Sequence, residues 1–196
     1  MEAIMNDKIY QKSILAGILI GIGVIINAMA GVPIAGALFF SFGLVAICHY
    51  GLFLYTGKIG NPGSLRSELP TIFIWNIVGI LIVTGIFIIA NPAAVGIFST
   101  IAAVKFKKTI LQFFLMGVLC GGLVHIGVKA DNYLITIAAV AIFILIGAEH
   151  CIALWPFVLV DFTVMKFIKF IAVIIGNSIG AIATQYLLYG EFDKCE

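Results

Sequence analysis

Six long apolar runs constrain the fold of this chain more than any other feature of its sequence. A helix needs roughly 20 apolar residues to cross a bilayer, and each run is about that long. Because 63% of the residues are hydrophobic and only 10% are charged, a soluble domain of this size could not bury its apolar side chains. The sequence therefore predicts an all-α integral membrane protein with six transmembrane helices. The predicted spans are residues 13–30, 34–55, 69–90, 109–128, 133–160 and 167–189.

Six crossings would place both ends of the chain on the same side of the membrane. Basic side chains are divided almost equally between the two sides, so the positive-inside rule does not orient the chain. Lys8 and Lys12 precede the first run, which lacks a small-residue cleavage site and is therefore expected to be a span rather than a signal peptide. The net charge of +2 gives no indication of a nucleic-acid partner.

The two halves of the chain carry a short common motif. WNIVG in the third run and GNSIG in the sixth both contain Asn-x-x-Gly, with Asn76 and Asn177 at the first position. Three spans are an odd number, so a duplicated half would be inverted in the membrane, as in many channels and transporters. We therefore predict one domain, residues 1–196, built from inverted pseudo-repeats of three spans each, about 10–90 and 105–190.

Spans two and five are predicted to be broken helices. Gly51 precedes LFLYTGKIG in span two, and Gly147 precedes a charged pair in span five, which is longer than a straight crossing needs. Irregular backbone is tolerated at membrane depth only where it is buried in protein or lines a cavity. Between the halves, the stretch 91–104 predicts a short helix with Asn91 as its cap and Pro92 at its first position.

Glu149 and His150 stand side by side in sequence that otherwise suits hydrocarbon. An ionisable group at the bilayer centre costs at least ~2.5 kcal/mol and marks a functional site by default. Because imidazole titrates near ~6.5, we predict that His150 lines a pore; a neutral ring bonded inside the bundle is the alternative. Glu149 would lie about 100° around a regular helix from His150. We predict a structural carboxylate that accepts backbone N–H groups, with control of the pore's electric field as the alternative.

Other polar side chains in or beside the spans have two interpretations each. The Thr56 hydroxyl ends the break in span two and could hold a passing anion or close a helix end. His49 and His125 each stand alone in an apolar run, so we expect satisfied interior or interface side chains. The cluster that opens span four is expected to snorkel to the headgroups, although it could also form a positive mouth. This cluster consists of Lys105, Lys107 and Lys108.

Sequence motifs of enzymes and metal sites are missing. There is no Walker loop, GxSxG or HExxH motif, so we expect no enzyme. The four cysteines show no CxxC spacing and are expected to be small apolar filler, so we predict neither a metal nor another cofactor. These cysteines are Cys48, Cys120, Cys151 and Cys195.

Four segments carry a more specific signal: FFSFGLVAICHYGLFLYTG at residues 39–57, WNIVG, IGAEHCIAL and IIGNSIG. The first resembles the second helix and Ω-loop of the formate/nitrite transporter family, and IGAEHCIAL is similar to that family's G-F-E-H-S-x-A-N segment. The other two resemble its N-L-V-G and I-G-N-I-I-G segments. The likeness extends across nearly the whole chain, from the first span to the sixth.

This resemblance implies an aquaporin-like protomer in a homopentamer with a separate pore in each subunit. It also implies a multi-pass protein of a prokaryotic plasma membrane, with cytoplasmic termini, that conducts small monovalent anions and binds no nucleic acid. Position by position, Thr56 matches the Ω-loop threonine, His150 the central pore histidine, and Lys105 a lysine that supports the positive field of the pore. The positions that match hydrophobic constrictions are Phe40, Leu44, Leu54, Tyr55, Val124 and Phe143.

Departures from the family pattern leave the transported anion open. They are expected to widen or depolarise the region near the central histidine. The residues that depart are Phe53, Gly121, Ala148 and Leu154.

The function expected is a channel or proton-coupled transporter for small weak-acid anions such as formate, nitrite or hydrosulfide. A bare anion loses its hydration in an apolar constriction, and protonation removes most of that cost. One alternative is a channel for neutral solutes, although the paired NPA boxes of aquaporins are absent and the single NPA at 91–93 has no partner. The other is a membrane protein that transports nothing, for which only Glu149 and His150 offer a catalytic pair.

Overall fold

A computed structural model describes residues 2–190, with side chains described from residue 8 onward, so Cys195 lies outside the described residues. Within this part of the chain the regular secondary structure is entirely helical. The elements are α1 (Glu2–Met29), α2 (Pro33–His49), α3 (Tyr55–Lys58), the 3-10 helix η1 (Gly63–Glu68), α4 (Leu69–Ala90), α5 (Ala94–Lys105), α6 (Ile110–Lys129), α7 (Tyr133–Leu145), α8 (Cys151–Leu159) and α9 (Val164–Tyr189).

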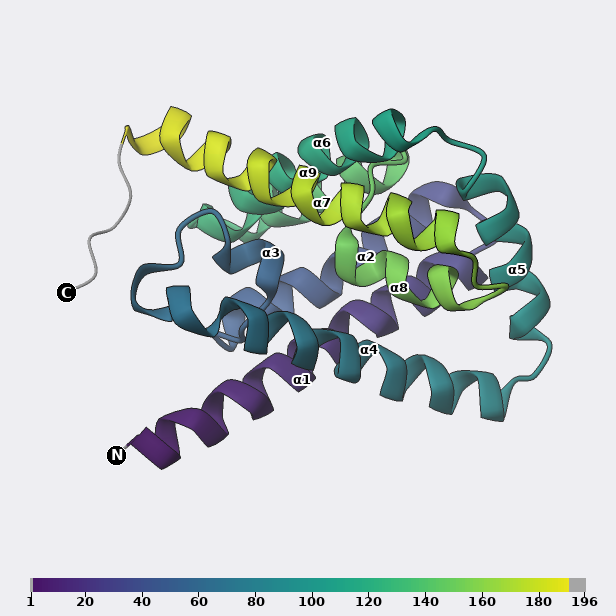
Figure 1. The fold of residues 1–196 in the computed structure, drawn as a ribbon, viewed down its shortest axis with the longest axis horizontal. Helices are drawn as coiled ribbons and strands as arrows, with labels where there is room; N and C mark the ends of the chain where they lie inside the picture. Colours follow the sequence, from purple (N-terminus) through teal and green to yellow (C-terminus); the bar gives the residue numbers. More distant parts are fainter. Residues whose placement is uncertain (1, 191–196) are drawn as a thin grey trace.

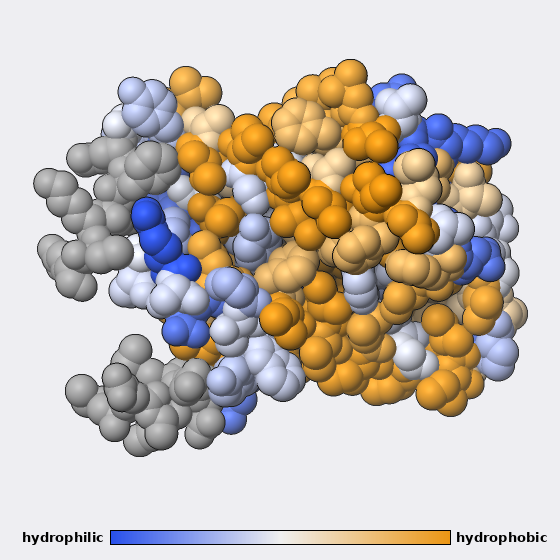
Figure 2. Space-filling model, in the orientation of Figure 1, coloured by the Kyte–Doolittle hydropathy of each residue, from blue (hydrophilic) through white to orange (hydrophobic). Residues whose placement is uncertain are grey.

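The distribution of apolar side chains is that of a membrane protein. Figure 2 shows a broad apolar band around the middle of the molecule, with hydrophilic side chains gathered toward the two ends of its long axis. Four helical segments of the described chain are long and apolar enough to cross a membrane. The chain is therefore an all-helical, multi-pass membrane protein. The four segments are Lys8–Met29, Gly63–Ala90, Ile110–Lys129 and Val164–Tyr189.

The long helices are arranged in two pairs. Helix α1 lies against α4, α6 lies against α9, and the shorter α2 and α7 pack against each other between the pairs (Figure 1). Both ends of the described chain lie at one end of the molecule, whereas α5 crosses the opposite end. The two short helices α3 and α8 lie between the pairs.

Backbone contacts between glycine and the facing helix hold each pair together. A Cβ atom on Gly17 of α1 would lie 2.1 Å from the backbone oxygen of Asn76 in α4. In the other pair, a Cβ atom on Gly121 of α6 would lie 2.1 Å from the backbone oxygen of Asn177 in α9. Small residues let membrane helices approach this closely, because no side chain separates the backbones. Gly121 therefore serves helix packing.

The helix between the halves begins later than its sequence predicts. Asn91 ends α4 and Pro92 stands outside any helix, while α5 begins at Ala94 with Ala93 at the N-cap position and no side-chain cap. The prediction of Asn91 as the cap was wrong. The backbone oxygen of Asn91 accepts the Ala94 N–H at 3.0 Å, so a backbone turn takes the place of a capping side chain.

Candidate functional site

The site is built on two interruptions of helical structure. Helix α2 ends at His49 and α3 begins at Tyr55; helix α7 ends at Leu145 and α8 begins at Cys151. Each connecting segment contains a glycine with positive φ, Gly51 at 58° in the first and Gly147 at 70° in the second. Glycine reaches this conformation without a steric penalty, so both connecting segments can turn sharply at these points.

Asn76 of α4 holds the first interruption. Its side-chain oxygen accepts the N–H of Tyr55, the first residue of α3, at 2.8 Å. Its amide nitrogen donates to the backbone oxygens of Ser13 in α1 and Phe53 in the connecting segment, both at 2.8 Å. One buried side chain thus satisfies two backbone groups of the interruption, where no helix can do so, and also bonds to a carbonyl of α1.

Asn177 of α9 holds the second interruption in the same way. Its oxygen accepts the N–H of Cys151, the first residue of α8, and its nitrogen donates to the backbone oxygens of Gly117 in α6 and Glu149, all at 2.8 Å. The two asparagines therefore form equivalent backbone clamps, one in each half of the chain. The Asn-x-x-Gly motif occurs in both halves of the chain, and in each half its asparagine makes this set of hydrogen bonds.

The two interruptions meet at Thr56 and His150. The Thr56 hydroxyl oxygen lies 2.8 Å from Nε2 of His150, and both side chains are buried. The backbone N–H of Ala153 donates to Nδ1 of His150 at 3.2 Å, so His150 is the N-cap of α8. Because Nδ1 accepts, the proton of the neutral ring belongs on Nε2, which donates it to the Thr56 hydroxyl.

Glu149 is an almost completely buried carboxylate with two lysine partners. Its two oxygens accept from Nζ of Lys105 at 2.9 Å and Nζ of Lys108 at 2.8 Å. Lys108 also donates to the backbone oxygen of Gly147 at 2.9 Å, which ties it to the second interruption. We call these three side chains the lysine–glutamate triad, and its formal net charge is +1.

The triad changes the interpretation of the lysine cluster. Snorkelling was predicted for all three lysines, and this is wrong for Lys105 and Lys108, which turn inward to Glu149. Lys107 is the exposed member. Backbone N–H groups were predicted to bind the Glu149 carboxylate. Among the described residues, the ammonium groups of two lysines bind it instead, because a buried carboxylate is more stable beside a compensating charge.

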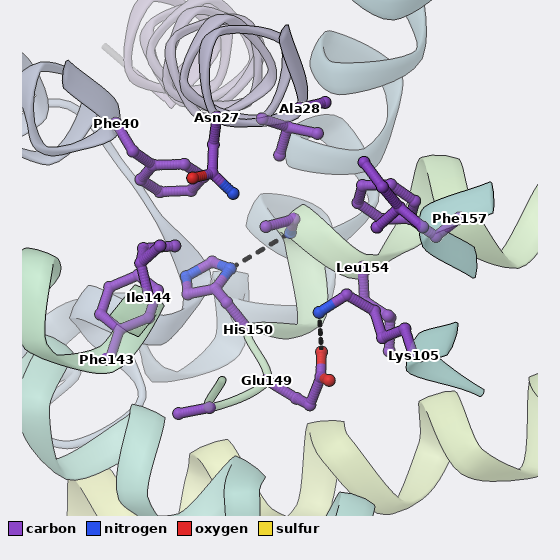
Figure 3. Close-up of a pocket in the computed structure, with 14 residues that line it drawn as sticks. Asn27, Ala28, Phe40, Lys105, Phe143, Ile144, Glu149, His150, Leu154 and Phe157 are labelled. Atoms are coloured by element: carbon purple, nitrogen blue, oxygen red, sulfur yellow. Dashed lines mark hydrogen bonds and ion pairs between the residues drawn. The ribbon is translucent and has the colours of Figure 1, made fainter. Parts of the chain in front are cut away.

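A cavity of about 130 Å³ lies beside this triad, at the end of the molecule that α5 crosses (Figure 3). Glu149 and His150 both line it, although adjacent residues of a regular helix would point about 100° apart. They can share the cavity because residues 148–150 are not helical. Two of the four departures from the family pattern, Ala148 and Leu154, also line it.

Sequence reasoning missed one polar residue of this cavity. Asn27, near the end of α1, lines it together with residues of α2, α5, α7 and α8. The available signal was a single amide in the first apolar run, at GVIINAMA. An isolated polar residue in a span belongs to no motif, so nothing in the sequence connected it to His150.

A second cavity, of about 170 Å³, lies toward the end that holds the chain termini. Its lining includes Leu54, Lys58 of α3 and Val128 near the end of α6. Thr56 and His150 therefore stand in a region with a cavity on each side. Gly121 and Phe53 line neither cavity, so these two departures from the family pattern do not directly enlarge either cavity.

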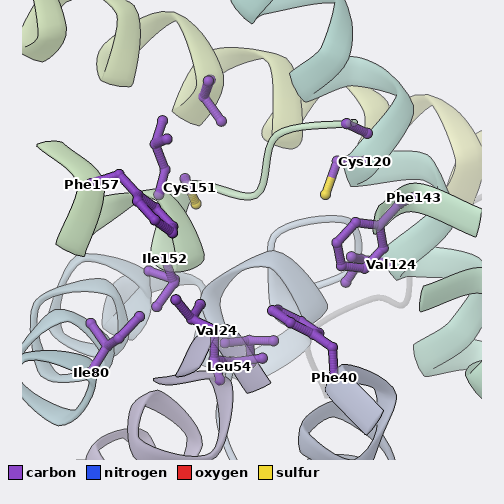
Figure 4. Packing of buried hydrophobic residues seen from close by; sticks show 14 of the residues in the cluster. Val24, Phe40, Leu54, Ile80, Cys120, Val124, Phe143, Cys151, Ile152 and Phe157 are labelled. Carbon is purple, nitrogen blue, oxygen red and sulfur yellow. The ribbon is translucent and has the colours of Figure 1, made fainter. Parts of the chain in front are cut away.

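The side chains expected at constrictions belong to one buried apolar cluster, with one exception. Phe40 and Phe143 border the cavity beside the triad, and their rings are 5.9 Å apart in an edge-to-face arrangement. Leu54 borders the second cavity. Tyr55 differs because it packs on Phe73 and bonds to Ser178 at 3.0 Å, away from both cavities. The cluster members among the expected residues are Phe40, Leu44, Leu54, Val124 and Phe143. All of them except Leu44 are labelled in Figure 4.

The remaining candidate side chains stand apart from this site. His125 is fully buried, with Nε2 2.8 Å from the side-chain oxygen of Gln185 in α9. His49 is exposed, with Nδ1 3.2 Å from the Tyr133 hydroxyl. Among residues 2–190, no three His, Cys, Asp or Glu side chains converge as metal ligands would.

No protein-family model matches the sequence, and no curated protein matches it either. The solved structures that share its fold include two channels. One, described as a pentameric formate channel with formate bound, has a TM-score of 0.76 and 23% identity over 96% of this chain and 97% of that chain. The other, described as an FNT family ion channel, has a TM-score of 0.81 and 18% identity over 96% of this chain and 91% of that chain. This chain has the fold of the FNT channels.

The FNT fold agrees with the resemblance to formate/nitrite transporters that the sequence motifs carry, and that expectation is confirmed at the level of the fold. Both solved structures are described as channels. Their identities to this chain are low, so the roles of individual side chains must be argued from the geometry above.

Proposed function

We propose that this chain is a member of the FNT family and conducts small monovalent anions of weak acids, with formate, nitrite and hydrosulfide as the candidate class. The observation that supports this most directly is the buried contact between Thr56 and His150, 2.8 Å long, at the meeting point of two helix interruptions. A titratable ring with a cavity on each side suits a pore that handles a proton as well as an anion.

The apolar cluster explains why a proton would matter. Phe40, Leu44 and Leu54 are each 2% exposed or less, so an ion that passes them loses its water. Dehydrating a bare anion in an apolar medium costs tens of kcal/mol by Born solvation, whereas the neutral conjugate acid avoids most of that cost. A second proton on His150 goes to Nδ1, which then no longer accepts the Ala153 N–H. We infer that this protonated ring gives its Nε2 proton to the anion, which leaves a neutral ring with its proton on Nδ1, and that the neutral acid passes the cluster.

Positive charge near both cavities favours entry of anions. The lysine–glutamate triad, with a formal charge of +1, borders the first cavity, and Lys58 lines the second. A cleft of one sign with low-dielectric walls raises the local concentration of the opposite ion. Lys105 is the triad lysine that lines the cavity, which supports its assignment to the pore's positive field.

The proposed topology has six crossings in two inverted halves. We assign them to α1, α2 with α3, α4, α6, α7 with α8, and α9, with α5 as the connection between halves. The equivalent clamps of Asn76 and Asn177 support this division. We further propose a homopentamer in a prokaryotic plasma membrane with cytoplasmic termini; the pentameric description of one similar structure supports the assembly.

Transport by purified protein in lipid vesicles tests the proposal. Vesicles that contain a pH-sensitive dye receive an inward gradient of sodium formate, nitrite or hydrosulfide. We expect a change of lumen pH that depends on both the anion and the protein. Osmotic swelling with glycerol or urea and no response to the anions would instead indicate a channel for neutral solutes. No response of either kind would indicate a protein without transport activity.

A further inference from the structure

The cavity beside the triad presents four polar side chains, and three of them already have partners. Glu149 accepts from two lysines, of which Lys105 is one, and both ring nitrogens of His150 are engaged. The fourth is Asn27, whose side chain has no hydrogen-bond partner among the described residues. A carboxamide carries two donor hydrogens and one acceptor oxygen. The hydrogen-bonding capacity of Asn27 is therefore left for whatever enters the cavity.

The contact between α1 and α2 fixes how this amide is presented. A Cβ atom on Gly36 would lie 2.7 Å from the side-chain oxygen of Asn27, so that oxygen is packed against the glycine backbone. The NH₂ group then faces the cavity, on the side of His150 and Lys105 (Figure 3). The amide is partly buried, and its backbone belongs to the long helix α1, which sets its place beside the cavity.

We propose that Asn27 binds the anion before it reaches the apolar cluster, and that it selects oxygen-containing anions. This inference rests on the proposed function and names the substrate class at the same site. Its NH₂ group donates to an oxygen of formate or nitrite and replaces a water molecule that the anion loses on entry. Lys105 supplies the charge at this position, and Asn27 supplies the directional hydrogen bond.

The two contributions differ in selectivity. The charge of the triad attracts every small monovalent anion, because Coulomb attraction does not depend on the chemical nature of the ion. An N–H donor favours an oxygen acceptor over sulfur, which is a weak hydrogen-bond acceptor. A site that hydrogen-bonds its substrate discriminates against an analogue that cannot complete the bond. Asn27 should therefore favour formate and nitrite over hydrosulfide.

The test measures the half-saturating anion concentration and the maximal flux in vesicles for wild type and Asn27→Leu. Leucine has the same branching as asparagine and suits an apolar span. We expect the half-saturating concentrations of formate and nitrite to rise about tenfold, the effect of losing one hydrogen bond to a charged group. For hydrosulfide the rise should be at most about twofold. Asn27→Ser, which keeps a shorter donor, should give an intermediate value for formate.

Asn91→Leu is the matched control, because the same substitution at the end of α4 removes an amide that lines neither cavity. It should leave all three half-saturating concentrations unchanged.

Asn27→Leu with wild-type values for formate and nitrite would overturn the inference and leave the proposed function standing. An equal rise for all three anions would overturn the selectivity. If the wild type transports none of them, the proposed function fails and the inference fails with it. Should Asn27→Leu not assemble, the serine variant decides, and wild-type values for it would overturn the inference.

Discussion

At the scale of single residues, His150 combines a structural contact with a chemical one. Its Nδ1 caps α8 by accepting the Ala153 N–H, and its Nε2 faces Thr56. These two contacts use different atoms, so a substitution can remove one and retain the other. Asparagine is among the most favoured N-cap residues, because its side-chain oxygen accepts the same kind of backbone N–H.

His150→Asn should therefore keep the fold and change the chemistry. If the ring donates its proton to the anion, wild-type formate flux should increase as pH falls, through one titration step. The variant cannot bind that proton, so its flux should lack the step. Uptake of formate, nitrite and hydrosulfide measured over a range of pH in vesicles checks this.

Leu44→Ala is the control for His150→Asn, because Leu44 belongs to the apolar cluster and carries no titratable group. Its flux should rise, since the constriction is wider, and its pH profile should match the wild type. A His150→Asn protein with unchanged rates and an unchanged pH profile would show that the imidazole is structural only.

The triad gives a second prediction at this scale. Lys105→Ala and Lys108→Ala each remove the net positive charge, so both should lower anion flux several-fold at low ionic strength. Lys107→Ala should have little effect, because Lys107 is exposed. Lys105→Ala should have the larger effect of the two, since Lys105 lines the cavity. Flux measured at two salt concentrations checks the electrostatic cause; equal, small effects at all three positions would contradict it.

Polar and titratable residues of the site could be identified from the sequence, whereas the residues that contact them could not. His150, Glu149 and Thr56 stood out because polar groups are costly in apolar runs. The identity of Glu149's partners depends on how α5 and α6 approach the second interruption. Residues 148–150 are not helical, so the 100° spacing of a regular helix does not set the direction of the Glu149 side chain. Asn27 was missed for the same reason, because its neighbours at the cavity come from four other elements.

At the scale of elements, the asparagine clamps determine where the helices stop and restart. Each clamp satisfies two backbone groups of an interruption, and water cannot readily replace the lost partners in a packed membrane protein. The sequence prediction of broken spans rested on Gly51 and Gly147, which are followed by residues that do not continue an apolar helix. The sequence did not predict the start of α5. A backbone turn replaces the expected side-chain cap there, and such a turn requires no particular residue type that could be recognised in the sequence.

Asn76→Ala and Asn177→Ala should each destabilise the protein by roughly 2 kcal/mol or more, because each leaves two backbone groups of an interruption without a partner, at a cost of ~1–3 kcal/mol per group. The control is Asn91→Ala, whose side chain has no hydrogen-bond partner within residues 2–190. Thermal unfolding in detergent, followed by circular dichroism, should show a lower midpoint for the first two variants. Midpoints equal to that of Asn91→Ala would mean that the clamps contribute nothing.

At the scale of the whole molecule, the proposed assembly divides the apolar band between lipid and neighbouring subunits. Large apolar side chains are exposed along it, for example Leu187 at 83% and Ile89 at 82%. In the proposed pentamer, part of this surface is covered by the next protomer, and each protomer retains its own pore.

Native mass spectrometry from mild detergent and from lipid nanodiscs should give the mass of five chains. A dilution series should leave that mass unchanged, since an extensive apolar interface dissociates slowly. A single-chain mass under both conditions would contradict the assembly.

The order in which the clamps can form has a consequence for biosynthesis. Every partner of Asn76 lies between Ser13 and Asn76, so the first clamp contains only residues that leave the ribosome early. Every partner of Asn177 lies between Gly117 and Asn177. The Thr56–His150 hydrogen bond joins a residue of the first half to one of the second. Each half can therefore mature as a translation intermediate, and the conducting centre is completed only when the second nascent half arrives.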